Sequence, residues 1–249
     1  MSPRVCVFVD GENFRHSIVE LFPTFRKEDY LPKSANWTGL FDWLVTQAAT
    51  EGERLRTYWY VIQSIDFWPY EFPNVDTELD RLYRLLRSHP PYREELDRLT
   101  NGGPREARMA EILQEMKGRR DKMIRRFDGW IIMQNGIATK HDAIEFRRSG
   151  AIRYDLFQES MGREKAVDVR LAVDLITLRD IYDIAVIVSG DQDYVPAVQV
   201  IKDSGKRVMN VAFQTRSGQL LPGGARRLNQ MTDRALTVLH SDLGGHLSL

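Results

Sequence analysis

The sequence has little cysteine and no long apolar segment. Its single cysteine, Cys6, lies within the apolar run 5–9, so an internal disulfide is impossible and we expect a buried thiol. The longest apolar runs have the length of a strand and are too short to span a membrane as a helix. The first residues lead directly into such a run, which does not fit a signal peptide. We therefore expect a cytoplasmic protein with no membrane contact.

Net charge is also absent, because 35 basic residues are balanced by 35 acidic ones. This balance argues against a protein that coats nucleic acid by bulk electrostatics. Two segments, 105–126 and 202–234, nevertheless carry an excess of basic residues, most of them arginine. Arginine suits bidentate contacts to phosphate, although the same pattern is typical of solvated helix faces with ion pairs. The second segment is the better candidate for contact with a phosphate-bearing partner.

Several well-known motifs are missing. The chain has no GxxxxGK[ST] loop, no GxGxxG turn and no GxSxG elbow, so nucleoside-triphosphate, dinucleotide and serine-hydrolase chemistry have no support. Its five histidines show no metal-ligand spacing. A site built from histidine or cysteine, as zinc prefers, is therefore not indicated.

Acidic residues follow two apolar strands directly. The run 5–9 ends at Asp10, and the run 184–188 is followed by Ser189, Gly190, Asp191 and, two residues later, Asp193. Open α/β sheets bind their ligands beyond the carboxyl ends of such strands. Neighbouring carboxylates repel one another unless a cation or a shared proton lies between them. The pattern therefore predicts a divalent-metal site.

A helix predicted over 165–179 adds a third source of carboxylate. At 100° per residue, Asp168 lies at the centre of the apolar face formed with Leu171 and Leu175. A lone carboxylate in apolar surroundings is costly, so Asp168 needs a partner. Asp174 falls near the polar boundary of this helix, where we expect a supporting or exposed residue.

The remaining pattern predicts an α/β fold with a doubly wound, mostly parallel sheet. Further strands are predicted at 54–65 and 207–213, and a hairpin over 143–157 with its turn at 147–150. A charged helical segment within about 67–149 interrupts the alternation of strands and helices, and we predict that it is an insertion. The pattern also predicts a final helix at 228–239 and a flexible, glycine-rich tail at 241–249.

Three segments resemble the signature blocks of the NYN domain, a branch of the PIN-like metal-dependent ribonucleases. They are VFVDGENF at 7–14, KAVDVRLAVDLI at 165–176 and IVSGDQDYVPAVQVIKDSGKRV at 187–208. The resemblance covers about 4–66 and 150–240, whereas 67–149 carries no motif of the family that we identify. It implies a single domain over 1–240 with a three-layer, Rossmann-like architecture and the insertion.

The resemblance also implies roles for particular residues. Four aspartates would form the catalytic metal site: Asp10, Asp168, Asp191 and Asp193. Asn13 and Ser189 would orient this site or the substrate phosphate, Lys165 would contact phosphate, and Asp174 would be supporting. Oxygen-only ligands favour Mg²⁺ or Mn²⁺. Basic residues must offset the repulsion between the acids and RNA, and the candidates are Arg15, Lys165, Arg216, Arg226 and Arg227.

These observations lead to the hypothesis of a metal-dependent endoribonuclease that acts on RNA. One alternative is a phosphatase of the haloacid-dehalogenase type, but Glu12 stands where that chemistry uses a second aspartate, and Asp191 and Asp193 are too close in the chain. Another is a non-catalytic RNA-binding or protein-interaction module, with the insertion docking a protein partner or a second copy. Individually, each acid also has an explanation as a turn or helix-capping residue.

Overall fold

The computed structural model describes residues 2–25, 30–99, 102–221 and 225–248. The chain forms two compact units, each with buried apolar residues of its own. Unit 1 comprises 1–63, 130–150 and 165–249, and unit 2 comprises 64–129 and 151–164. The assignment of 1–240 to one domain with an insertion at 67–149 stays a prediction.

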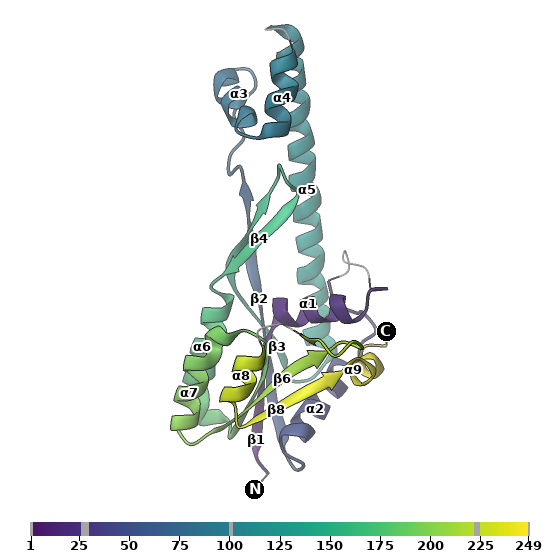
Figure 1. Ribbon diagram of the computed structural model, residues 1–249, viewed down its shortest axis with the longest axis vertical. Helices are drawn as coiled ribbons and strands as arrows, with labels where there is room; N and C mark the ends of the chain where they lie inside the picture. The colour runs from purple at the N-terminus through teal and green to yellow at the C-terminus, as the bar shows by residue number, and fades with distance from the viewer. Residues whose placement is uncertain (1, 26–29, 100–101, 222–224, 249) are drawn as a thin grey trace. The chain divides into compact units, whose positions relative to one another are not determined.

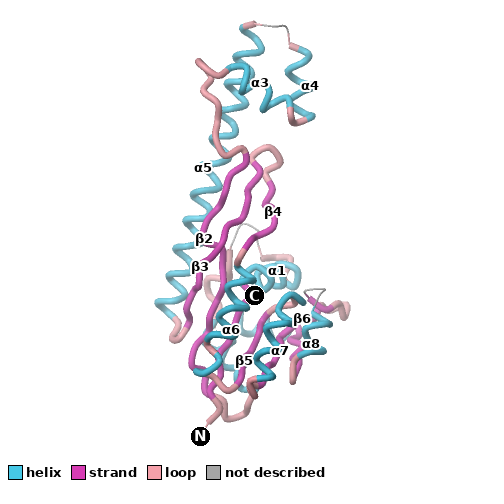
Figure 2. The backbone as a smooth tube through the Cα atoms, turned by 90° about the vertical axis from the view of Figure 1, so that its left-hand side faces the viewer, coloured by secondary structure: helices cyan, strands magenta, loops and turns pink. Residues whose placement is uncertain are grey.

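The sheet of unit 1 is mostly parallel, which confirms the predicted α/β class. Strand β1 pairs in parallel with β2 and β5, β5 with β6, and β6 with β8, whereas the short β7 is antiparallel to β6. The strand order is β3-β2-β1-β5-β6-β7, with β8 also on β6; β4, which pairs with β3, belongs to unit 2 up to residue 164. The strands are drawn in magenta in Figure 2. Their bounds are β1 Arg4–Asp10, β2 Glu53–Trp68, β3 Ile144–Asp155, β4 Ser160–Lys165, β5 Ile184–Val188, β6 Arg207–Gln214, β7 Leu220–Leu221 and β8 Arg234–Leu239.

Helices cover both faces of this sheet. Figure 2 shows α6 (Val167–Thr177), α7 (Val195–Asp203) and α8 (Ala225–Met231) in front of β5 and β6. On the other face lie α1 (Gly11–Leu21) and α2 (Trp37–Ala48), and α9 (His240–Leu247) packs against α2. The result is the three-layer arrangement that the alternating strands and helices predicted.

Alternation along the strands separates two aromatic cores. Phe8 contacts the ring of Tyr182 on the side of α6, at a centroid distance of 5.6 Å. Trp59, which is paired with the next residue of β1, contacts Phe14 and Trp37 on the side of α1 and α2. Because successive strand residues point to opposite faces, one apolar run supplies both cores. Cys6 is fully buried, as expected.

The predicted hairpin turn at 147–150 is wrong. Strand β3 continues through these residues, and the turn before β4 lies at 156–159 instead. Arg147 can remain within the strand because its guanidinium pairs with Glu145 and Asp174. Gly150 has a φ of +65°, and a Cβ there would overlap the carbonyl oxygen of Lys165. Glycine therefore serves close backbone approach rather than a chain reversal.

The chain after α8 also differs from the prediction. Helix α8 ends at Met231, and Arg234–Leu239 form β8 rather than the end of a helix. Asp233 fixes this strand on β6, since its backbone N–H donates to Val208 O and its carboxylate accepts from Val208 N. The predicted flexible tail is instead α9, in which Leu243 and Leu247 are fully buried.

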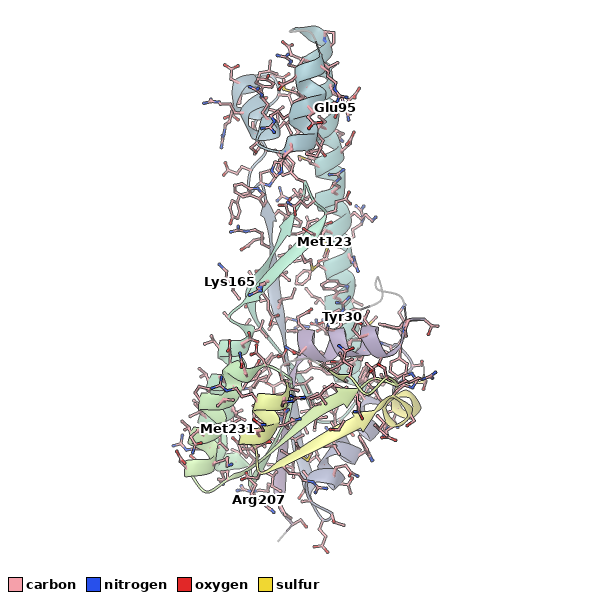
Figure 3. The ribbon with its side chains drawn as sticks, viewed as in Figure 1. Tyr30, Glu95, Met123, Lys165, Arg207 and Met231 are labelled. Carbon is pink, nitrogen blue, oxygen red and sulfur yellow. The ribbon has the colours of Figure 1, made fainter. Side chains whose placement is uncertain are left out.

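Unit 2 contains the predicted helical segment, as α3 (Leu79–Arg87), α4 (Pro90–Arg98) and most of α5 (Gly103–Lys140). Its core is lined by leucine, isoleucine and methionine, including Leu82, Leu96 and Ile112. Arg108 on α5 pairs with Glu95 of α4 at 2.6 Å, and Figure 3 shows Glu95 against α5. None of the described helices combines the length and the apolarity that a membrane span requires.

Candidate metal centre

Asp10 lies at the carboxyl end of β1 and caps the following helix. Its side chain is fully buried, and Oδ1 accepts from the backbone N–H of Asn13 at 3.1 Å. Oδ2 accepts from Asn13 Nδ2 at 2.6 Å. These two hydrogen bonds hold the carboxylate in one orientation, and the role of Asn13 in the site stays a prediction.

Ser189 follows β5 and connects that strand end to Asp10. Because Val9 pairs with Val188, the two carboxyl ends are neighbours in the sheet. The Ser189 hydroxyl donates to Asp10 Oδ2 at 2.8 Å and accepts from the backbone N–H of Asp191 at 3.0 Å. Its one proton is therefore committed to Asp10.

Asp168, in the first turn of α6, is connected to Asp10 by the hydroxyl of Tyr194, a residue that sequence reasoning missed. The buried Tyr194 hydroxyl donates to Asp168 Oδ1 at 2.9 Å, and it lies 3.3 Å from Asp10 Oδ2. Tyr194 directly follows Asp193, so its position beside the acidic motif was a signal. Its hydroxyl target depends on how α6 packs on the sheet, which the motif alone does not specify.

The carboxylates of Asp10 and Asp168 lie close together within unit 1. One oxygen of each lies within 4.8 Å of the other. Asp10 is buried, and Asp168 is half-buried. Such a pair of carboxylate oxygens could hold a hard cation.

The electrostatics of these groups reflect burial and mutual repulsion. Burial raises the pKa of Asp10 to about 7, while hydrogen bonds from Ser189 and Asn13 act in the opposite direction. The charges of Asp168 and Asp191 raise it further. Three of the four predicted aspartates therefore interact at one strand edge, where a cation would relieve their repulsion.

The outer part of the site is formed by the turn 191–194. Burial raises the pKa of Asp191, and the charges of Asp193 and Asp168 add to this increase. Asp191 Oδ1 accepts from the backbone N–H of Asp193 at 2.9 Å, and Asp193 itself is exposed. Burial and the nearby acids hold the pKa of Tyr194 well above its ordinary value, so its phenol remains a donor.

The predicted substrate-binding cations lie in different surroundings. Arg15 on α1 is half-buried, 4.0 Å from the Glu12 carboxylate, with its guanidinium 5.6 Å from the ring centre of Trp130. Lys165 is exposed where the chain leaves β4 for α6, as Figure 3 shows. Arg216, Arg226 and Arg227 are also exposed. Contact of any of them with substrate stays a prediction.

Asp174 is placed differently from what the helical pattern indicated. It is buried, and its Oδ2 accepts from Tyr60, Arg147 and Arg170 at 3.1, 2.5 and 3.1 Å. Asp168, which the same pattern put at the centre of the buried face, is only half-buried. The difference arises because β2 and β3 bring Tyr60 and Arg147 to that flank of α6. Asp174 thus belongs to a separate ion-pair cluster.

Comparison with known proteins gives a family and little else. A family model described as the NYN domain matches residues 92–221, more than half of the chain. The chain therefore belongs to the NYN domain family. Membership in this family indicates a PIN-like nuclease. The match includes Asp168, Asp191 and Asp193 and omits β1 with Asp10. It begins within 67–149, the segment predicted to be an insertion, in which the sequence showed no motif of the family.

Other comparisons add no argument. No curated protein matches the chain. The crystal structure of a protein of unknown function from Vibrio parahaemolyticus is similar over 95% of this chain and 93% of that chain. Its sequence identity is 14% and its TM-score is 0.44, so this likeness supports neither the fold nor the function.

Proposed function

We propose that this protein is a metal-dependent endoribonuclease that hydrolyses RNA phosphodiester bonds with Mg²⁺ or Mn²⁺. The observation that carries the proposal is the convergence of Asp10 and Asp168 on one buried tyrosine hydroxyl, with Asp191 joined to Asp10 through Ser189. Membership in the NYN family supports the same reaction class. Asp193 completes the proposed ligand set.

The donor set fits a hard divalent cation. The side chains that converge here offer carboxylate oxygens, which Mg²⁺ and Mn²⁺ prefer. Such an ion, when bound, would polarise a phosphodiester. It would also lower the pKa of a bound water molecule, so that hydroxide becomes available as a nucleophile at neutral pH. The raised pKa of Asp10 fits a carboxylate whose charge needs a cation for balance.

The protein's own side chains would divide the remaining work. Asp10 is held rigidly by Asn13 and Ser189, so its oxygens are fixed before any ligand arrives. The exposed Asp193 lies toward solvent, from which substrate must approach. Exposed cations such as Lys165 would offset the repulsion between the acids and the RNA backbone.

The test is RNA cleavage with Mn²⁺ by wild type, by Asp191→Asn and by Asp180→Asn, an exposed acid remote from the motif. We expect EDTA to stop cleavage and Asp180→Asn to cleave as wild type does. Asp191→Asn should lower the cleavage rate by more than about 100-fold, because the loss of a metal ligand should exceed the effect of losing a residue that only orients a ligand. Cleavage that persists in Asp191→Asn would contradict the proposal. RNA binding that ignores both metal and Asp191 would instead support a binding module.

A further inference from the structure

A cavity of about 430 Å³ lies in unit 1 outside the carboxylate centre. It is lined by residues at the ends of two strands and in the segments directly after those strands: Gln214, Thr215, Arg216, Gly218, Leu239, His240 and Ser241. Among these described lining residues none is acidic, and Arg216 supplies a positive charge. The cavity therefore suits an anionic or polar ligand.

The sheet topology puts this cavity on the same edge as the metal centre. Strands β1, β5, β6 and β8 are all parallel, so their carboxyl ends lie at one edge of the sheet. Asp10 and Ser189 follow β1 and β5, whereas Gln214 and Leu239 end β6 and β8. In Figure 1 the arrowheads of β6 and β8 both point toward α9, which begins at His240.

The separation suits a chain of nucleotides. Neighbouring strands lie about 4.8 Å apart, so β8 lies about 10 Å from β5 across the sheet. Val188 ends β5 and pairs with Val211, and β6 and β8 both continue about 10 Å further, to Gln214 and Leu239. A single phosphodiester at the carboxylate centre cannot extend over that distance. An RNA strand with nucleotides on either side of the scissile bond can, if its backbone follows the edge of the sheet.

A hydrogen-bonded turn after β6 exposes Arg216 for contact with a phosphate. The turn that carries it is closed by Thr215 N to Gln219 O at 2.9 Å and by Gly218 N to Thr215 O at 3.0 Å. Arg216 is exposed at this turn, so its guanidinium can make a bidentate contact to phosphate. The His240 ring, which also lines the cavity, packs against the tilted ring of Phe22 at a centroid distance of 4.5 Å, and this contact restricts its orientation.

We propose that this cavity binds the phosphodiester backbone of an RNA strand whose scissile bond lies at the carboxylate centre. Arg216 contacts a phosphate, and His240, Thr215 and Ser241 supply hydrogen bonds to phosphate or ribose. The inference rests on the proposed endoribonuclease function for its link to cleavage. The binding itself can be measured without catalysis.

The experiment compares Arg216→Glu with Arg207→Glu, which changes net charge equally. Arg207 is an exposed arginine at the opposite end of the same strand, as Figure 3 shows. Binding of a fluorescent RNA oligonucleotide is measured by anisotropy in EDTA. We expect Arg216→Glu to weaken binding by about tenfold or more, the value of one charge-assisted hydrogen bond, and Arg207→Glu to bind as wild type does.

Cleavage kinetics with Mn²⁺ then separate this inference from the proposed function. We expect Arg216→Ala to raise KM more for an oligonucleotide than for a dinucleotide, whereas Asp191→Asn removes turnover of both. Equal losses of binding in the two glutamate variants, or no RNA binding by wild type, would overturn the subsite. Binding that depends on Arg216 in a protein that cleaves no RNA would retain the subsite and refute the nuclease.

Discussion

The Ser189 hydroxyl donates a hydrogen bond of 2.8 Å to the carboxylate of Asp10, although the two residues are 179 positions apart. The bond connects the ends of β5 and β1. Since the same hydroxyl accepts from the backbone N–H of Asp191, it fixes one carboxylate and the loop that carries another. Ser189 is therefore a positioning residue for the proposed metal centre.

Ser189→Ala should weaken Mn²⁺ binding by about 10- to 100-fold, the usual effect of losing a hydrogen bond that orients a ligand. Isothermal titration calorimetry measures this affinity directly. Ser204→Ala, which removes a hydroxyl that donates to Ile201 O within its own turn, is the matched control. Equal Mn²⁺ affinities in wild type and Ser189→Ala would show that the bond does not position the site.

Added metal should stabilise the protein. The like charges of Asp10, Asp168 and Asp191 oppose one another in the metal-free state, and a cation that binds only the folded form adds about 2.7 kcal/mol at 100 times its Kd. Thermal unfolding with Mn²⁺ or EDTA measures the gain. Asp191→Asn should lose much of this gain in stability, whereas Asp180→Asn should keep it. If Mn²⁺ stabilised Asp191→Asn as much as wild type, the cation would bind elsewhere.

Tyr194→Phe separates a role in the site from a purely structural one. Without the hydroxyl, Asp168 and Asp10 lose a shared donor, so we expect the metal-free protein to lose about 1–3 kcal/mol of stability. The metal-bound protein should lose less, because the cation also neutralises these acids. Denaturant unfolding with and without Mn²⁺ tests this difference. Equal losses in both states would mean that the hydroxyl has a structural role that does not depend on the metal.

The buried pair Arg147–Asp174 should be important for folding but not for metal binding. Their side chains are 18% and 6% exposed, and Arg147 also lies 4.0 Å from the ring centre of Tyr58. Arg147→Met should cost about 3–5 kcal/mol, since it leaves Asp174 buried with less compensation.

Two further variants check this explanation of the Arg147–Asp174 pair by denaturant unfolding. Arg56→Met, which breaks an exposed pair with Glu145, should cost less than about 1 kcal/mol. Adding Asp174→Asn to Arg147→Met should restore part of the lost stability, because the uncompensated charge is removed. If the double variant were less stable than the single one, buried charge would not be the cause.

The exposed pair between Arg4 and Asp183 should affect stability only above strongly acidic pH. Hydrogen bonds from the Arg4 side chain and backbone lower the pKa of Asp183 to about 2. Because the folded pKa lies below the unfolded value, this stabilisation is complete above about pH 4 and is lost as pH falls through 2. Exposure limits it to at most about 1 kcal/mol.

Asp183→Asn should therefore be less stable than wild type at pH 7, and the difference should close as pH falls from about 4 to 2. Urea unfolding at several pH values measures this difference. A difference that stays constant across that range would show that the carboxylate charge contributes nothing beyond its hydrogen-bond geometry.

The sequence by itself determined the strand-and-acid pattern of this protein. The apolar runs before Asp10 and before the motif at 189–193 have the length and the composition of buried strands, and acids follow each run directly. Both features can be recognised within a few neighbouring residues, so the sequence alone predicted carboxylates at the ends of two strands. The parallel sheet, the helix that carries Asp168 and the buried position of Cys6 followed from the same local rules.

Only the tertiary structure decided which side chains meet. The partners of Tyr194, the burial of Asp174 and the continuous strand through Arg147 depend on contacts between segments that are far apart in the chain. A helical period places a residue on a face but does not tell which strand that face will meet. Long-range packing thus reversed the relative burial of Asp168 and Asp174 and joined the end of β6 to the start of α9 in one cavity.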